Sequence, residues 1–316
     1  MRYLIMGVGA LGTVFGGFLR RAGHAVDFIG RGRHFEVLCR QGLAIDGIWG
    51  EHRWGPIEGI PVDPANIQPY DVILLCVKSF DTEAACQRVR DLLVPRGLII
   101  SIQNGLGNLE TIAQICGPNA TIGARVIFGA QIRQPGVATV TVYADKVLLG
   151  ALLPDNNRNR RLRQAVTDLN EAGIPTRLED NIITPIWEKV LYNCALNPLG
   201  AILGVTYGDL AASSDTRGLM FSLIEEIYQV AAVKQIPLSH TTAQSYFQHF
   251  LERLVPPTAA HYPSMLQDLQ QGRRTEIEAL NGAICRYGKQ HRIRTPYNES
   301  ITQLIRFRQT LAGVSK

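Results

Sequence analysis

A glycine-rich turn near the N-terminus constrains the fold of this chain more than any other stretch. An apolar run at residues 3–6 leads into the motif GVGALG at residues 7–12, and a helical pattern and a second apolar run follow at residues 13–21 and 25–29. This order of strand, glycine turn, helix and strand is what a dinucleotide-binding βαβ unit requires. The residues expected to line the dinucleotide are Gly7, Val8, Gly9, Ala10, Leu11 and Gly12. A glycine-rich turn in another α/β fold is the alternative.

The end of the second strand indicates which dinucleotide is bound. Arg31 follows this strand, at the place where NAD-binding proteins carry an acidic residue. A guanidinium group pairs well with a 2′-phosphate, so the sequence favours NADP(H) over NAD(H). Asp27 lies inside the strand and is taken as structural. Lys78 follows the apolar run 72–77 and is expected to be a second phosphate contact, or else an ordinary exposed lysine.

The remaining strand patterns extend this domain to about residue 180. Residues 42–54 are expected to form a hairpin, and residues 158–172 a helix. Further strands are expected at 72–77, 98–102, 121–128, 137–142, 146–149 and 175–178. The short turns between the last strands favour antiparallel pairing at the sheet edge. Asn104 follows the strand at 98–102, which predicts a position near the nicotinamide, although Asn104-Gly105 is also a plain turn signal.

After residue 180 the strand patterns disappear and helical periodicity continues. The helices are expected at 184–204, 222–234, 241–254, 265–271, 277–290 and 297–311. The fold class is therefore α/β, with a Rossmann-type nucleotide-binding domain at residues 1–180 and an all-helical substrate domain at residues 181–316.

The first of these helices carries an unusual polar row. Lys189, Asn193 and Asn197 are four residues apart along an otherwise apolar stretch, so they share one helix face. Buried polar groups without partners are costly, and a bound polar ligand would satisfy all three at once. Snorkelling of the lysine and capping by the asparagines are the alternatives. Pro198 is expected to kink or end the helix just after Asn197.

The segment from Ser264 to Glu278 leaves two interpretations open. Ser264 and Thr275 are candidate helix caps, followed by acidic residues in the first turns. Alternatively, Ser264 and Glu276 face Lys189. The spacing in the sequence does not decide between them.

Composition narrows the class of partner. The chain has 316 residues, 46% of them hydrophobic and 19% charged, with a formal net charge of +5. These values are typical of a globular protein, and no basic run long enough to follow a nucleic-acid backbone occurs. An anionic small molecule suits the positive charge. The six cysteines are widely spaced and predict reduced thiols without a metal site. No leader or membrane-spanning stretch is evident, so a cytoplasmic protein is expected.

Together these stretches resemble the ketopantoate reductase (2-dehydropantoate 2-reductase) family. The resemblance is carried by GVGALG, Lys78, Gln-Asn-Gly around Asn104, the row from Trp187 through Lys189, Asn193 and Asn197 to Pro198, and Ser264 and Thr275-Glu276. It implies that Lys189 is the proton donor and that Asn193, Asn197 and Ser264 hold the substrate. It also implies that Glu276 lies between cofactor and substrate, and that Arg31 and Lys78 meet the 2′-phosphate.

The expected activity is NADPH-dependent reduction of 2-dehydropantoate to pantoate, a step of pantothenate biosynthesis. Asp81, Tyr207 and His261 depart from the family pattern, where amides that contact cofactor or substrate can occur. These departures keep a different 2-keto acid open as substrate. A non-catalytic NADP(H)-binding sensor is the rival from another class. The apolar helices after residue 205 could serve a homodimer as readily as a core.

Overall fold

The computed structural model describes residues 1–57, 68–153 and 159–313. The chain forms two compact units: residues 1–103 and 108–182 make up the first, and residues 104–107 and 183–316 the second. The short segment 104–107 therefore belongs to the second unit, although the first unit precedes and follows it in sequence.

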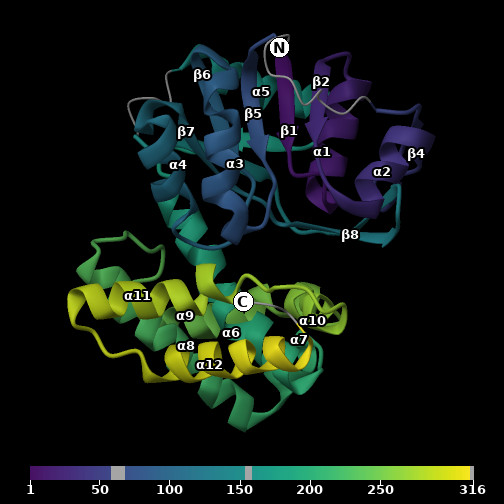
Figure 1. Ribbon diagram of the computed structural model, residues 1–316. Helices are drawn as coiled ribbons and strands as arrows, with labels where there is room; N and C mark the ends of the chain where they lie inside the picture. The colour runs from purple at the N-terminus through teal and green to yellow at the C-terminus, as the bar shows by residue number, and fades with distance from the viewer. Residues whose placement is uncertain (58–67, 154–158, 314–316) are drawn as a thin grey trace. The chain divides into compact units, whose positions relative to one another are not determined.

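The first unit is built on a twisted sheet of seven described strands, in the order β11-β10-β7-β6-β5-β1-β2 (Figure 1). The strands are β1 (Arg2–Met6), β2 (Ala25–Ile29), β5 (Tyr70–Leu75), β6 (Leu93–Ser101), β7 (Thr121–Arg125), β10 (Val147–Ala151) and β11 (Thr176–Leu178). Neighbouring strands from β2 to β7 are parallel, and β10 turns antiparallel to β7. The central strands are continuous apolar runs because helices cover both faces of the sheet. The predicted Rossmann-type domain is confirmed.

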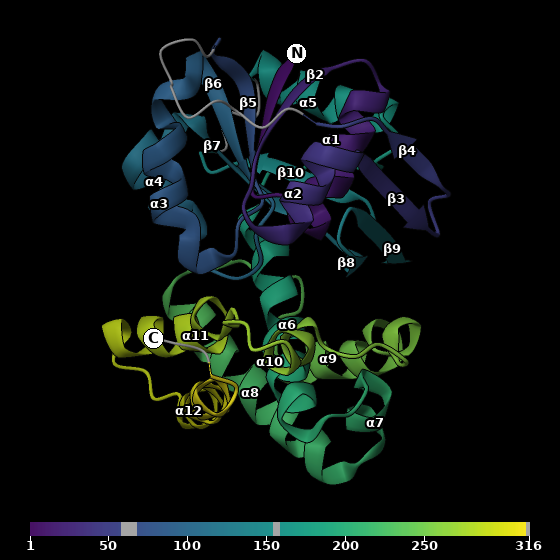
Figure 2. The same ribbon diagram turned by 45° about the vertical axis from the view of Figure 1, so that its right-hand side comes forward.

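Helices cover both faces of this sheet (Figures 1 and 2). α1 (Ala10–Arg21) and α5 (Arg160–Glu171) contact each other on one face, while α3 (Thr82–Val89) and α4 (Asn108–Cys116) pack together on the other. α2 (Gly32–Gln41) follows β2. Sequence periodicity located α1 and α5, apart from the expected start of α5 at residue 158, which lies outside the described residues. It did not single out α2, α3 or α4.

A second, four-stranded sheet packs against α1, in the order β4-β3-β9-β8. Its strands are β3 (Leu43–Gly47), β4 (His52–Trp54), β8 (Phe128–Gln134) and β9 (Val137–Tyr143). The expected hairpin at 42–54 is the antiparallel pair β3-β4. The single strand expected at 121–128 is wrong: the chain divides after Arg125, and β7 and β8 join different sheets. The strand pattern of residues 121–128 does not reveal such a change of sheet.

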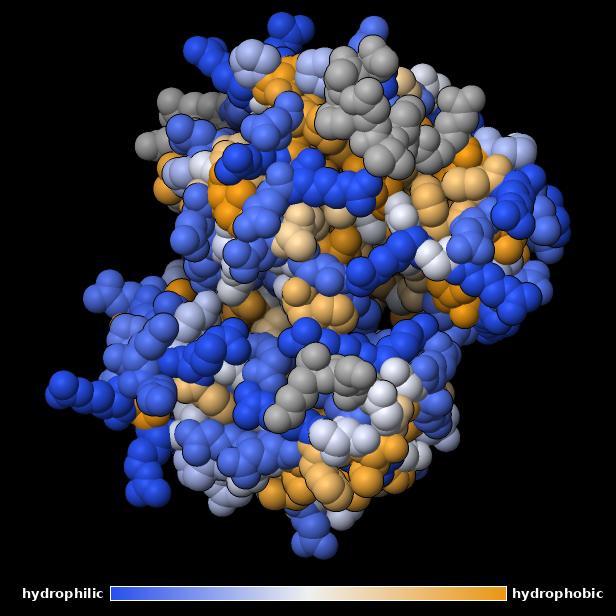
Figure 3. All heavy atoms as spheres, in the orientation of Figure 1, coloured by the Kyte–Doolittle hydropathy of each residue, from blue (hydrophilic) through white to orange (hydrophobic). Residues whose placement is uncertain are grey.

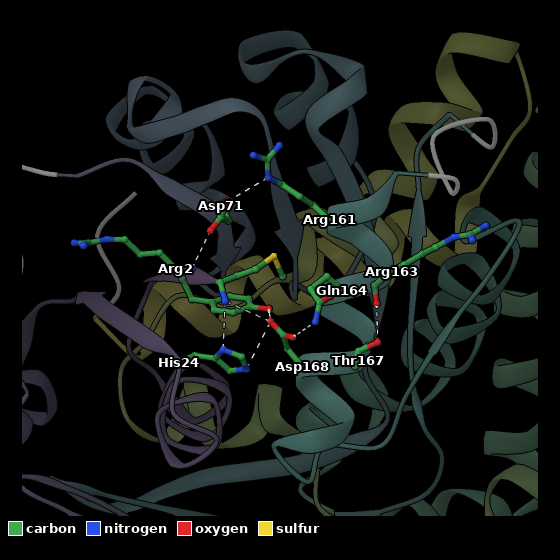
Figure 4. A network of polar contacts seen from close by, with 10 residues as sticks. Arg2, His24, Asp71, Arg161, Arg163, Gln164, Thr167 and Asp168 are labelled. Atoms are coloured by element: carbon green, nitrogen blue, oxygen red, sulfur yellow. Dashed lines mark hydrogen bonds and ion pairs between the residues drawn. The ribbon is translucent and has the colours of Figure 1, made fainter.

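A buried polar network ties β1 to α5 (Figure 4). Asp168 is 1% exposed and accepts hydrogen bonds from the Tyr3 hydroxyl at 2.6 Å and from Gln164 Nε2 at 2.7 Å. The His24 ring lies 3.6 Å from the same carboxylate. Burial and the neighbouring carboxylate both raise the pKa of Tyr3 far above its ordinary value, so its hydroxyl stays a donor. The network lies at the N-terminal end of β1 and is structural.

The second unit is helical. Its helices are α6 (Ile183–Leu203), α7 (Tyr207–Ala212), α8 (Ser214–Val233), α9 (Ala243–His249), α10 (Ser264–Gln270), α11 (Asn281–His291) and α12 (Pro296–Leu311). A π-helical turn continues α9 to Leu254, and a 3₁₀ turn at Ile277–Ala279 precedes α11. The helices expected after residue 180 are thus found, with α7 in addition, but α8 begins at Ser214 and not at the expected residue 222. A break at Leu280 divides the helix expected at 277–290.

Of the two expected effects of Pro198, a kink or a helix end, the helix end is wrong, because α6 runs on to Leu203. Pro198 has no N–H to donate to the carbonyl of Cys194. Asn281 at the start of α11 supplies the missing donor: its Nδ2 lies 3.2 Å from that carbonyl oxygen and 3.0 Å from Asn298 Oδ1. A side chain from a neighbouring helix therefore completes the hydrogen bonding of α6.

Hydrophilic residues, in blue, predominate on the face drawn in Figure 3, and hydrophobic residues, in orange, reach the surface between them. One exposed apolar group, Leu304, Phe307 and Leu311, follows a single face of α12. Among the described helices, none combines the length and the hydropathy needed to cross a membrane.

Candidate active site

The glycine turn of the first unit has the geometry of a phosphate-binding loop. Gly7 has a φ of +101°, and a Cβ there would lie 2.6 Å from the backbone nitrogen of Val77. A Cβ on Gly12 would lie 2.1 Å from the Gly7 carbonyl oxygen. Gly9 is exposed, and a Cβ there would meet nothing within 4 Å. Gly7 and Gly12 are therefore required for packing, whereas Gly9 leaves the backbone open to a ligand.

The N-terminus of α1 completes this loop. The helix begins at Ala10, and no side-chain hydrogen bond caps it among the described residues. Its first turn has no acidic residue, so the partial positive charge at the helix N-terminus is not neutralised locally. Open backbone N–H groups and this charge are suited to a pyrophosphate. The residues present therefore fit a dinucleotide.

Arg31 and Lys78 lie after β2 and β5, the two strands that flank β1 in the sheet. The chain runs outward in opposite directions from β1 and β5, which makes this the topological switch point where nucleotides bind. Arg31 is the N-cap residue of α2, and its side chain is 84% exposed. Its Nη2 donates to Asp81 Oδ2 at 2.6 Å. Arg31, the predicted contact of the 2′-phosphate, is thus paired with Asp81, which departs from the family pattern.

In the second unit, α6 carries the polar row as the sequence predicted. Asn193 and Asn197 are 9% and 7% exposed, and Lys189 is half-buried. The Lys189 ammonium donates a hydrogen bond to Asn104 Oδ1 over 2.6 Å. Two predicted site residues that are 85 positions apart in sequence are therefore in direct contact.

Asn104 reaches Lys189 because its segment docks on the 3₁₀ turn at Ile277–Ala279. Leu106 N donates to the Ala279 carbonyl at 2.7 Å, and the Leu106 side chain is buried. Gly105 has a φ of +84°, and a Cβ there would lie 2.4 Å from the same carbonyl oxygen. Only glycine fits this close approach. Glu276, 8% exposed, is the N-cap of this turn, so Asn104 and Glu276 are held by one local structure.

The two asparagines differ in how they are held. Tyr207 Oη donates to Asn197 Oδ1 at 2.5 Å, and the tyrosine is 4% exposed. Burial raises the pKa of Tyr207 far above its ordinary value, so the hydroxyl remains a donor. This hydrogen bond orients the Asn197 amide, whose Nδ2 can then donate to a ligand. No protein partner of the Asn193 side chain occurs among the described residues.

Ser264 lies near the end of the polar row. It is exposed and is the first residue of α10, after Pro263. A Cβ on Gly200 would lie 2.7 Å from Pro263 Cγ, so the start of α10 packs directly on α6 one turn beyond Asn197. The capping interpretation of Ser264 is wrong, because Pro263 is the N-cap and no side-chain cap bond forms in the described structure.

Tyr207 and His261 form an aromatic pair beside the polar row. Their ring centroids are 5.3 Å apart in an edge-to-face arrangement, and Tyr207 N donates to the His261 carbonyl. Burial lowers the pKa of His261, which favours the neutral ring. The sequence marked both residues as departures from a pattern, but it carried no signal that the tyrosine holds Asn197.

Comparison with protein families covers most of the chain. A profile described as "Ketopantoate reductase PanE/ApbA" matches residues 3–153, and one described as "Ketopantoate reductase PanE/ApbA C terminal" matches residues 181–309. The 2-dehydropantoate 2-reductase of Aquifex aeolicus is 40% identical over 315 residues, which span 98% of this chain and 97% of that protein.

Two solved structures match nearly the whole chain. The 2-dehydropantoate 2-reductase of Geobacter metallireducens superposes with a TM-score of 0.85 at 28% identity, covering 97% of this chain and 99% of that one. A D-mandelate dehydrogenase solved with NADH and anilino(oxo)acetate gives a TM-score of 0.89 at 27% identity, with both chains fully covered.

Proposed function

Because this chain belongs to the ketopantoate reductase family, we propose that it reduces 2-dehydropantoate to pantoate, a step of pantothenate biosynthesis, with NADPH as reductant. The observation that carries the proposal is the contact between Lys189 Nζ and Asn104 Oδ1 at 2.6 Å, on the helix face shared with Asn193 and Asn197. An ammonium group and two largely buried amides on one face are suited to an anionic substrate with a carbonyl group.

Lys189 is the proposed proton donor. NADPH, when bound, supplies the hydride that reduces the ketone carbon. The Lys189 ammonium stabilises the negative charge that develops on the substrate oxygen and then transfers its proton to that oxygen. Asn104 accepts a hydrogen bond from the ammonium group and so helps to position it. A fixed donor avoids reorganisation in the transition state.

The substrate carboxylate needs donors, and the second unit supplies amides and a hydroxyl. Asn197 is proposed to donate from its Nδ2, because Tyr207 holds the amide by its oxygen. Asn193 has residual exposure without a described protein partner, which supports a role as a second amide donor. Ser264 is proposed as a third donor. Glu276 is proposed to lie between cofactor and substrate, as in the family that the sequence resembles.

NADP(H) is the proposed cofactor. Gly9 and the N-terminus of α1 are suited to the pyrophosphate, and Arg31 and Lys78 to the 2′-phosphate. The Arg31→Ala variant should lower the ratio of NADPH to NADH affinity, which direct titration of both dinucleotides measures.

The decisive experiment is steady-state reduction of 2-dehydropantoate by Lys189→Ala. General acid catalysis typically contributes about 10² to 10⁴ in rate, so kcat should fall by that factor. The Kd of NADPH, measured by fluorescence quenching, should change little. Lys289→Ala in the same unit is the matched control, because Lys289 is exposed and outside the site, and it should retain full activity. Loss of turnover and NADPH binding together would mean that Lys189 is structural.

A reductase of an aromatic 2-keto acid is the second candidate, favoured by the Tyr207–His261 ring pair beside Asn197. Assaying phenylglyoxylate beside 2-dehydropantoate separates the two, since the preferred substrate has the higher kcat/KM. Tight NADPH binding without turnover of any 2-keto acid would instead favour a non-catalytic sensor.

A further inference from the structure

The predicted 2′-phosphate ligand already has an anionic partner in this protein. Arg31 Nη2 and Asp81 Oδ2 are 2.6 Å apart, and the two residues are 50 positions apart in sequence. Asp81 lies in the turn Ser79–Asp81, immediately before α3 and three residues after Lys78. A carboxylate therefore lies among the cations to which the 2′-phosphate is assigned.

This carboxylate opposes a second anion in two ways. Arg31 can engage a phosphate fully only if it weakens its hydrogen bond to Asp81. A phosphate on the same guanidinium would also lie a few ångströms from the carboxylate, and like charges at that distance repel. A bare 2′-hydroxyl suffers neither effect, and it can donate a hydrogen bond to a carboxylate.

Asp81 has no other described role that would require an acid. Its side chain does not cap α3, and it is about one-third exposed. Exposed ion pairs of this kind contribute little to folding stability. Asp81 should therefore act mainly on the affinity of Arg31 for charged ligands.

We infer that Asp81 is a specificity-determining residue that weakens the preference for NADPH over NADH by competing with the 2′-phosphate for Arg31. The inference rests on the proposed function to the extent that Arg31 must meet the 2′-phosphate. The ratio of NADPH to NADH affinity should accordingly be lower in this protein than in a chain with a neutral side chain at this position.

The test measures the dissociation constants of NADPH and NADH directly, by fluorescence quenching on the full-length protein, so that it does not depend on turnover. Asp81→Asn should bind NADPH about three- to tenfold more tightly, while NADH affinity stays within about twofold. The gain should shrink as ionic strength rises, because both charges are exposed. Glu83→Gln removes the same charge from the exposed first turn of α3 and should leave the ratio unchanged.

The Arg31→Ala variant shows whether a negative result concerns the competition by Asp81 or the assignment of Arg31 to the 2′-phosphate. If Arg31→Ala lowers NADPH selectivity and Asp81→Asn does not raise it, Arg31 meets the phosphate and the competition by Asp81 is refuted. If neither variant changes selectivity, the cofactor assignment of Arg31 fails and the inference fails with it. An equal gain in Glu83→Gln would mean that net charge alone is responsible. Circular dichroism melts of each variant verify that the first unit remains folded.

Discussion

Replacing Asn281 by Ala should destabilise the helical unit, because a carbonyl group in α6 would lose its hydrogen-bond donor. Asn281 is fully buried, and its Nδ2 is shared between the Cys194 carbonyl oxygen at 3.2 Å and Asn298 Oδ1 at 3.0 Å. Alanine would leave both buried acceptors without this donor. A buried acceptor without a partner costs about 1 to 3 kcal/mol.

The substitution also removes an unsatisfied polar atom, which reduces the expected loss of stability. Asn281 Oδ1 is itself buried without a partner in the described structure. Alanine leaves two acceptors without a donor and removes one unsatisfied oxygen. The free energy of unfolding should therefore fall by about 1 to 3 kcal/mol, the cost of a single unsatisfied group. Unfolding should be followed by fluorescence of Trp187, which lies buried on α6, in a background with Trp49 and Trp54 replaced by Phe. The urea midpoint should fall correspondingly.

The informative variant adds Pro198→Ala to Asn281→Ala. Alanine at position 198 restores a backbone N–H that can donate to the Cys194 carbonyl within α6. This should recover about 1 kcal/mol in the Asn281→Ala background. In the wild-type background the carbonyl already has a donor, so Pro198→Ala should give no such gain. Strictly additive effects would refute the view that Asn281 compensates for the proline.

Two further predictions concern single side chains. Tyr207→Phe removes the hydroxyl that engages Asn197 Oδ1, so the amide can rotate and the KM for the keto acid should rise about three- to tenfold with a smaller change in kcat; an unchanged KM in steady-state assays would contradict this role. His34 accepts a hydrogen bond from Gly136 N, and burial lowers its pKa from 6.5 to about 4. The unfolded chain therefore takes up the proton first, and stability should be lost as the pH falls from 6.5 towards 4. Urea midpoints at pH 7 and pH 5 should differ less in His34→Gln, and an equal difference would argue against His34 as the cause.

Local chemistry determined much of what the sequence predicted. The glycine turn requires a strand before it and a helix after it, so the Rossmann-type unit followed from residues 3–29 alone. Four-residue spacing likewise puts Lys189, Asn193 and Asn197 on one face of any helix that contains them. Neither inference needed knowledge of distant parts of the chain.

Contacts between distant segments were decided by the tertiary structure. The strand pattern at 121–128 does not reveal that β7 and β8 join different sheets, because packing determines which strands pair. Pro198 predicted a kink or an end of the helix, but α6 continues past it, and Asn281 from another helix donates the hydrogen bond that proline lacks. Asn104 meets Lys189 because Leu106 N binds the Ala279 carbonyl and Gly105 permits that close approach.

The two classes of result differ in physical origin. Backbone sterics and helical periodicity act over a few residues, so the sequence by itself determined the fold class and the residues of the polar row. Hydrogen-bond partners such as Tyr207 for Asn197, or Asp81 for Arg31, depend on where separate elements pack. Only the folded chain could decide which groups are engaged and which remain available to a ligand.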